Sequence, residues 1–418
     1  MKDRAAPARI ALIGALDTKG EDFRFVRDRI VAEGAAPLVI DIGVLDDPLF
    51  PPDITSAQIA LAGGSRIDLL RAHRDKTEAM RIMTAGAVSV VRELHEKGEL
   101  QGILGMGGTG GTAIASACMR SLPIGLPKVL VSTAGSGDMS AYVAFKDIAV
   151  FPSIVDVAGI NRISRCIYAN AAAAIVGMVR RTSLPDFAGR PSIAASMFGN
   201  TTPCIERAKS VLERSSYEVL VFHATGAGGK AMASLCSEGL LSGVLDLTTT
   251  ELADEVCGGV FTAGPARIQI GAARPIPVVL APGCVDMCNF WARETVPSRY
   301  SDRRLYQWNP NVTLMRTNVE ENTRIGEMIA ETANACAGKV AILLPLRGVS
   351  MLDSKGEPFW DPDADAACFA AIRRRVKPGI PVVEVDANIN DPEFANQAAA
   401  GLLNLLDDSK ARAQSGLL

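Results

Sequence analysis

The stretch GILGMGGTGGTAIAS, residues 102–116, decides the fold. It begins as a short apolar strand, continues through a glycine-rich turn, and opens into a helix near Gly111-Thr112-Ala113. Glycine lets the backbone turn tightly and approach a ligand with no Cβ in the way. The first amides of a helix have no partner within the helix and carry partial positive charge. The stretch therefore predicts a binding site for phosphate or carboxylate oxygens, and we expect a nucleotide.

The composition narrows the class of protein. A chain of 418 residues is expected to form two or three domains. A net charge of −3 gives no reason to expect nucleic-acid binding. No apolar run reaches the ~18 residues of a membrane span, and the N-terminus reads as a first strand, not a signal peptide. Nine cysteines without a spacing pattern indicate reduced thiols and a cytoplasmic location, and three histidines make a histidine-rich metal site improbable.

Strand and helix patterns alternate along the whole chain, which predicts parallel sheets covered by helices on both faces. The expected fold is α/β, with two doubly wound, Rossmann-like parallel-sheet domains and an interdomain cleft. A polar, proline-containing stretch at residues 182–191 sets the expected boundary, which gives an N-terminal nucleotide-binding domain at 1–185 and a C-terminal domain at 190–418. Ligands of such sheets bind beyond the carboxyl ends of the strands. The expected strands are 10–14, 38–42, 102–104, 128–132, 147–155, 193–197, 219–222, 243–247, 278–281, 340–344 and 382–385.

A similar glycine turn occurs later in the chain. Residues 108–118, GTGGTAIASAC, align with residues 226–236, GAGGKAMASLC, at a constant offset. Each copy follows an apolar strand, so the alignment indicates that each domain presents a strand, a glycine turn and a helix that bind an anion. It is also compatible with an internal duplication.

Two familiar nucleotide motifs fit the first turn poorly. Residues 105–110 match GxGxxG, but the carboxylate that a dinucleotide site places at the end of the next strand is missing before Asp138. A P-loop requires Lys and then Ser or Thr after the last glycine, and neither turn supplies this pair. The remaining alternative without a ligand is close packing of the helix on the sheet.

Other polar residues follow predicted strands of the first domain. Lys19 is placed to reach a phosphate, and Asp17 to hold a magnesium ion through water. The hydroxyls and carboxylate of Ser132, Ser136 and Asp138 are candidates for further contacts. Ordinary turn chemistry explains all of these residues equally well.

In the second half, five residues near strand ends are candidates for binding a carboxylate or phosphate and moving a proton. They are His223, Lys230, Asp286, Arg347 and Asp353. Cys284 is a weaker candidate for a nucleophile, because the sequence shows no activating partner. The G-x-S-x-G motif of serine hydrolases is missing.

Together these motifs resemble the Tm-one-like ATP-binding family, which includes the nucleotide-binding domain of the plant tobamovirus-resistance protein and bacterial relatives. The residues that carry the resemblance are LDTKG at 16–20, GMGGTGGT at 105–112, STAGSGD at 132–138, FHATGAGGKAM at 222–232, APGCVDMCNF at 281–290, NPNVTLMRTN at 309–318 and LLPLRGVSMLD at 343–353. The resemblance implies two α/β domains, ATP with Mg²⁺ bound mainly by the N-terminal one, and dimers. Carried over, the nucleotide contacts fall on Thr18, Lys19, Gly107, Gly108, Thr109, Gly110, Gly111 and Thr112. Ser132, Gly135, Ser136 and Asp138 are further candidates for contacts, and Asp17 stays a candidate from its position after the first strand.

Three functions remain open from the sequence. The first is a nucleotide-binding protein whose phosphates lie on the turn at 105–112. The second is an enzyme (a hydrolase, lyase or transferase) that acts on a small carboxylate or phosphorylated metabolite in the cleft. The third is a regulatory interaction protein for which ATP is a structural ligand. The expected partners are a small anionic ligand and a second copy of the chain, with no nucleic acid and no membrane.

Overall fold

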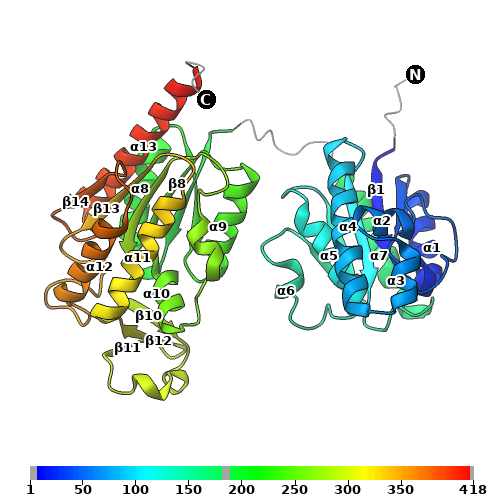
Figure 1. The fold of residues 1–418 in the computed structure, drawn as a ribbon, viewed down its shortest axis with the longest axis horizontal. Helices are drawn as coiled ribbons and strands as arrows, with labels where there is room; N and C mark the ends of the chain where they lie inside the picture. The colour runs from blue at the N-terminus through cyan, green and yellow to red at the C-terminus, as the bar shows by residue number, and fades with distance from the viewer. Residues whose placement is uncertain (1–6, 181–188, 415–418) are drawn as a thin grey trace. The chain divides into compact units, whose positions relative to one another are not determined.

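The computed structural model describes residues 7–180 and 189–414. The chain forms two compact units, Met1–Phe187 and Ala188–Leu418, each with its own sheet (Figure 1). Most of the expected boundary stretch lies outside the described residues. The expected cleft between the two units stays a prediction.

The N-terminal unit is built on a five-stranded parallel sheet of order β2-β1-β3-β4-β5. The order reverses between β1 and β3, which is the position where ligands of doubly wound sheets generally bind. The strands are β1 Arg9–Gly14, β2 Ala36–Asp41, β3 Gly102–Gly107, β4 Lys128–Ser132 and β5 Ala149–Pro152. The helices are α1 Leu16–Ala32, α2 Ser56–Ala62, α3 Ile67–His73, α4 Lys76–Glu96, α5 Thr109–Ser121, α6 Ser140–Val143 and α7 Arg162–Val179.

Helices cover both faces of this sheet because successive strand residues point to opposite sides. On β1, Ile10 and Leu12 pack with α1 and α7, whereas Ala11 and Ile13 pack with α2, α4 and α5. All four side chains are fully buried. Strands buried on both faces read as continuous apolar runs, which is why the sequence identified them.

The C-terminal unit holds a six-stranded parallel sheet of order β14-β13-β9-β8-β6-β7, which reverses between β6 and β8. Helices α8 and α13 cover one face, and α9 to α12 cover the other. The strands of this sheet are β6 Ser192–Met197, β7 Glu218–His223, β8 Gly243–Thr248, β9 Val278–Gly283, β13 Val340–Pro345 and β14 Val382–Val385. The helices are η1 Gly199–Thr201, α8 Thr202–Arg214, α9 Ala227–Glu238, α10 Thr250–Cys257, η2 Gly264–Gln269, η3 Arg293–Thr295, η4 Ser298–Tyr300, α11 Val319–Ala335, α12 Pro362–Arg375 and α13 Pro392–Gln414.

A small antiparallel sheet, which the sequence did not reveal, belongs to the C-terminal unit. Its strands β10 Met287–Phe290, β12 Val312–Arg316 and β11 Leu305–Asn309 lie at the end of the large sheet where α10 begins (Figure 1). The strands are four or five residues long and lack the apolar run of a buried parallel strand. The small sheet therefore covers the carboxyl edge where a ligand would otherwise bind.

The predicted α/β class and the two doubly wound sheets are confirmed. Residues 46–65, which the sequence indicated as a loop, contain α2, whose first turn is fixed by reciprocal bonds between Thr55 and Gln58. Among the described residues, no helix combines the length and apolar character that crossing a membrane requires.

Two helical glycines of the N-terminal unit test how tightly its helices pack. At Gly86 on α4, a Cβ would lie 1.9 Å from the Ile59 carbonyl oxygen of α2, whereas at Gly177 on α7 nothing lies within 4 Å. Gly86→Ala should lower the free energy of unfolding by roughly 1–3 kcal/mol, because the two helices must move apart. Gly177→Ala should raise it by up to ~1 kcal/mol through helix propensity. Urea denaturation followed by far-UV circular dichroism measures both, and equal effects of the two substitutions would contradict the described packing.

Candidate functional site

The N-terminus of α5 is open. Gly108 is the cap residue, no side chain of the described residues caps it, and the first helical bond runs from the Thr112 amide to the Gly108 carbonyl at 2.9 Å. The amides before Thr112 have no acceptor within the helix. They border a hollow of about 340 Å³ at the carboxyl edge of the sheet. The hollow is lined by Gly108, Thr109, Thr133, Ser153, Ile154, Val155 and Asp156.

Close packing explains only some glycines of this turn. A Cβ at Gly105 would lie 2.5 Å from the Ala115 Cβ, and one at Gly107 would lie 2.9 Å from the Gly111 Cα, so both positions must stay small. At Gly108 the nearest atom would be 3.9 Å away, and at Gly110 it would be 3.7 Å away, which are ordinary contacts. Packing therefore does not account for Gly108 and Gly110.

Lys19 lies beside this hollow. Its ammonium donates a hydrogen bond to the carbonyl oxygen of Val157, the residue that follows Asp156. Lys19 also interrupts α1, with a non-helical φ of −130° and ψ of 20°. The Lys19 ammonium is thus held by the protein itself, at the residue that follows Asp156. Thr18 is exposed in the same turn.

Thr112 and Ser132 are not available to a ligand. Both are fully buried, and their hydroxyl oxygens lie 2.8 Å apart in a hydrogen bond that joins α5 to β4. Gly135 lies where a Cβ would come within 2.8 Å of the Pro152 Cα, so the backbones of two loops explain it. Asp138 accepts the Ser140 amide at the start of α6, and this bond lowers the pKa of its carboxyl. Ser136 is exposed.

The carboxylate of Asp17 serves the protein's own loops. Its Oδ1 accepts the Thr18 amide at 2.7 Å, and its Oδ2 accepts the amides of Leu45 and Asp46 at 2.9 and 3.3 Å. Within the described residues, no group of three or more His, Cys, Asp or Glu side chains is placed to hold a metal ion. Any Mg²⁺ bound here would therefore take much of its coordination from water and from the ligand.

The second glycine turn is already occupied. Glu251 Oε1 accepts the amides of Gly226 and Gly229 at 2.7 and 3.1 Å, while Glu251 Oε2 accepts from Arg267 Nε at 2.7 Å. Arg267 also bonds both carboxylate oxygens of Asp246, and all three charged side chains are buried. The prediction that this turn binds an external anion is therefore wrong, because a carboxylate of the same unit fills it.

The two glycine turns are not equivalent in the fold. The first follows β3, which lies at the reversal of its sheet, whereas the second follows β7, which lies at the edge of its sheet. Their cap residues also differ, with φ of −71° at Gly108 and 78° at Gly226. The turn alignment therefore does not reflect a duplicated site. The two sheets nevertheless share a strand order: when the strands of each sheet are numbered along the chain, the first five lie in the order 2-1-3-4-5.

The five predicted catalytic residues do not form one site. Strands β8 and β6 separate β7, which ends at His223, from β9, which precedes Asp286. Arg347 is exposed and pairs with Asp386 through two bonds of 2.7 and 2.6 Å. His223 packs edge-on against Phe198, and partial burial lowers the pKa of its imidazole. Lys230 lies on α9 next to the turn that Glu251 fills.

Asp286 and Asp353 do come together, but in the interior. Ser350 Oγ donates to Asp286 Oδ2 at 2.8 Å, and Arg316 lies 3.5 Å from Asp353 and 2.9 Å from Asp365. Burial, with the neighbouring charge of Asp353, raises the pKa of Asp286 to about 7 and that of Asp365 to about 9. Both side chains are fully buried, and their described partners belong to the same unit.

Cys284, the alternative nucleophile, is also buried. Burial raises the pKa of its thiol well above the usual value, so the thiol stays protonated and is a poor nucleophile.

Sequence reasoning missed the loop after β5, which supplies Ser153 to Asp156 to the hollow. The signal was present, because a strand was expected at residues 147–155 and the charged residue Asp156 follows it. The rule that ligands bind beyond carboxyl ends would have added this loop to the candidate site.

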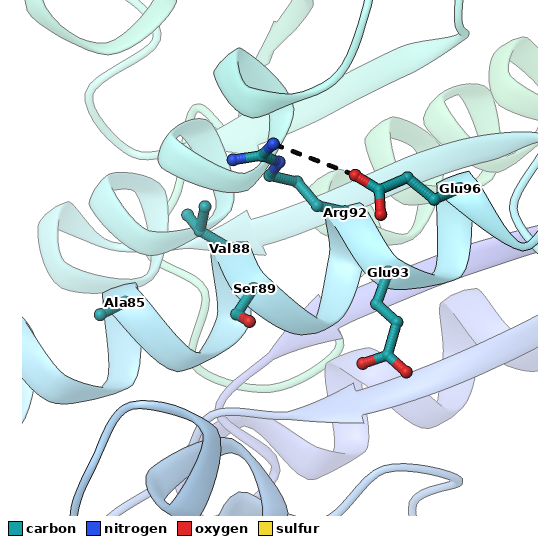
Figure 2. A pocket seen from close by; sticks show the side chains of 6 residues that line it. All are labelled: Ala85, Val88, Ser89, Arg92, Glu93 and Glu96. Atoms are coloured by element: carbon teal, nitrogen blue, oxygen red, sulfur yellow. Dashed lines mark ion pairs between the residues drawn. The ribbon is translucent and has the colours of Figure 1, made fainter.

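A hollow on α4 is a different kind of feature. Figure 2 shows that its six lining residues all come from this one helix, with Arg92 and Glu96 paired at 3.9 Å. A surface made by one helix encloses no ligand. The hollow at α5 instead joins loops from three strand ends, which is the usual construction of a binding site.

Two family models cover nearly the whole chain. The model described as the N-terminal domain of the uncharacterised protein family UPF0261 matches residues 8–184, and its C-terminal counterpart matches residues 190–406. The chain belongs to family UPF0261. A UPF0261 protein of Clostridium tetani is 46% identical over 401 residues, which cover 96% of this chain and 99% of the relative. A UPF0261 protein of Mesorhizobium japonicum is 45% identical and covers 94% and 98%.

The UPF0261 relatives extend to plants. The tomato (Solanum lycopersicum) protein called ToMV resistance protein Tm-1(GCR237) is 35% identical over 96% of this chain and 56% of its own length. The resemblance to the tobamovirus-resistance protein and bacterial relatives is thereby confirmed. Among solved structures, an A-type ketoreductase of a modular polyketide synthase covers 94% of this chain and 96% of its own, but 11% identity and a TM-score of 0.22 carry no argument.

The Glu251 carboxylate offers a test of the second turn in this UPF0261 chain. Glu251→Ala leaves Arg267 and two amides without their partner, and should lower the free energy of unfolding by about 3–5 kcal/mol. Formate should restore part of this loss by occupying the vacated position. All three tryptophans lie in the C-terminal unit, so urea denaturation followed by tryptophan fluorescence reports on it.

The matched control is Glu255→Ala, which removes an exposed carboxylate from the same helix. It should cost little stability and show no response to formate. Equal formate responses of the two variants would contradict the role given to Glu251.

The Asp286 carboxyl gives a pH-dependent prediction. A pKa raised to about 7 in the folded state means that the folded protein holds a proton which the unfolded chain releases near pH 4. The contribution of Asp286 to stability is therefore lost as the pH rises toward and through 7. Asp286→Asn removes this loss, so the variant should gain roughly 1–3 kcal/mol relative to the wild type between pH 5 and pH 8. Tryptophan-monitored urea titrations measure the difference, and a difference that is constant with pH would refute the assignment.

Proposed function

We propose that the N-terminal unit binds ATP, with the phosphate oxygens on the amides at the start of α5. One observation carries this proposal: the α5 N-terminus is uncapped and borders a hollow, although packing does not require glycine at Gly108 or Gly110. Unpaired amides and the helix dipole favour an anion at this position.

The C-terminal unit provides an internal comparison. There the same kind of turn is satisfied by a carboxylate that accepts two amides, which shows that an oxyanion suits such a turn. Among the described residues, no side chain plays the part of Glu251 at the first turn. An external oxyanion is the natural partner for these amides, because buried or half-buried amides without acceptors are costly.

The sheet order supports a nucleotide as the source of that oxyanion. The 2-1-3-4-5 order places the loops after β1 and β3 on either side of the reversal, where doubly wound proteins bind nucleotides. Lys19 comes from the first turn of α1, which follows β1, and the glycine turn follows β3. The family resemblance implies ATP with Mg²⁺, which agrees with this placement.

The enzymatic alternative has less support. His223 and Lys230 follow β7 at one edge of the C-terminal sheet, whereas Asp286, Arg347 and Asp353 follow β9 and β13. Asp286 and Asp353 are also buried. The proposal is therefore ATP binding, without an assigned reaction.

Two substitutions at Thr109 distinguish the contribution of its backbone amide to ATP binding from that of its side chain. Thr109 is the first residue of α5, a position that accepts proline because its amide makes no helical bond. Thr109→Pro removes one donor to the phosphate and should weaken ATP binding on the order of 10- to 100-fold. Thr109→Ala keeps the amide and is the matched control, with a smaller effect. Isothermal titration calorimetry with Mg·ATP measures both.

The proposal fails if the wild-type protein binds NADH but not ATP. It also fails if the proline and alanine variants bind ATP with equal affinity. Circular dichroism checks that α5 remains folded in the proline variant.

A further inference from the structure

We propose that Asp156, rather than Asp17, holds the divalent cation that accompanies the nucleotide. This inference rests on the proposed function. It follows from the charge of the hollow, from the bonds that already occupy Asp17, and from the position of Asp156 on a fixed loop.

The side chains that line the hollow carry negative charge, which repels a triphosphate that has no bound cation. Asp156 is the one charged side chain among its lining residues, and no Lys or Arg lines the described part of the hollow. Lys19, the nearby cation predicted from the sequence, donates to the Val157 carbonyl. A triphosphate with several negative charges therefore needs a cation between itself and Asp156.

Asp17 is poorly placed for this role. Three backbone amides occupy its two oxygens, from its neighbour Thr18 and from Leu45 and Asp46 in the loop after β2. The carboxyl group also packs against Gly43, where a Cβ would come within 2.6 Å of it. Asp17 therefore fixes the loop after β2, and metal binding would compete with that task.

Asp156 is better placed than Asp17 to bind a cation. Its side chain is exposed to the hollow and accepts no hydrogen bond described in this part of the chain. The loop that carries it is fixed, because Ser153 Oγ donates to the Val155 carbonyl at 2.6 Å and the Ser153 amide donates to the Ser132 carbonyl at 3.0 Å. The carboxylate is therefore held at the hollow by backbone bonds and keeps its oxygens for a ligand.

The donor set fits Mg²⁺. This ion keeps several of its waters and is bound through one or two carboxylates together with substrate phosphates. A single aspartate beside phosphate oxygens supplies that arrangement without a preformed cage. It also agrees with the finding that the described residues contain no group of three metal-ligating side chains.

The experiment compares ATP binding with Mg²⁺ and with EDTA, by isothermal titration calorimetry, for the wild type, Asp156→Asn and Asp17→Asn. Asp156→Asn should weaken Mg·ATP binding roughly tenfold or more, the scale on which metal sites respond to loss of a supporting group. It should leave metal-free ATP binding unchanged or tighter, because a repulsive charge is removed. Asp17→Asn, the competing candidate, should keep the wild-type ratio of the two affinities.

A spectroscopic measurement provides a second test of the inference. Mn²⁺ bound in the presence of ATP should give an electron paramagnetic resonance signal that changes in Asp156→Asn and stays as in the wild type in Asp17→Asn. The thermal unfolding midpoints of both variants show whether each remains folded.

Three results overturn the inference. An equal loss for Mg·ATP and metal-free ATP in Asp156→Asn would mean that Asp156 binds the ribose hydroxyls. A changed ratio in Asp17→Asn alone would return the cation to Asp17, and an unchanged ratio in Asp156→Asn would remove Asp156 from the site. Failure of the wild type to bind either form of ATP is a distinct outcome, which overturns the proposed function and this inference with it.

Discussion

The amides that begin a helix must find oxygen acceptors, and this constraint organises both units. At α9, the buried Glu251 supplies the acceptor and is itself balanced by Arg267. At α5, no side chain of the described residues takes that part, and a hollow lies beside the turn instead. Two similar local sequences therefore differ in their surroundings: in one unit a carboxylate of the protein accepts the amides, whereas in the other the turn borders a hollow.

Strand order decides which residues meet at each carboxyl edge. In the N-terminal sheet, the loops after β1, β3, β4 and β5 remain open at that edge and bring Lys19, the glycine turn, Thr133 and Asp156 into one neighbourhood. In the C-terminal unit, the small sheet β10-β12-β11 covers the corresponding edge. Asp286 is buried there, and this burial explains the raised pKa of its carboxyl.

The sequence predicted the parallel strands well, since a strand buried on both faces is an unbroken apolar run. It missed β10 to β12 because short antiparallel strands have no such run. Of the residues that line the hollow at α5, the sequence singled out Gly108 and Thr109 but not Asp156, which follows an expected strand. It also assigned ligand contacts to Thr112 and Ser132, whose hydroxyls bind each other in the interior.

By itself, the sequence determined the fold class and the location of two glycine turns that each precede a helix, because both depend on local patterns of apolar residues and glycine. The tertiary structure decided which of two similar turns is open. That outcome depends on Glu251, which is 22 to 25 residues away from the amides it binds. It also decided that His223 lies apart from Arg347 and Asp286, because β8 and β6 separate β7 from the adjacent strands β9 and β13, and this order is not written in the spacing of residues along the chain.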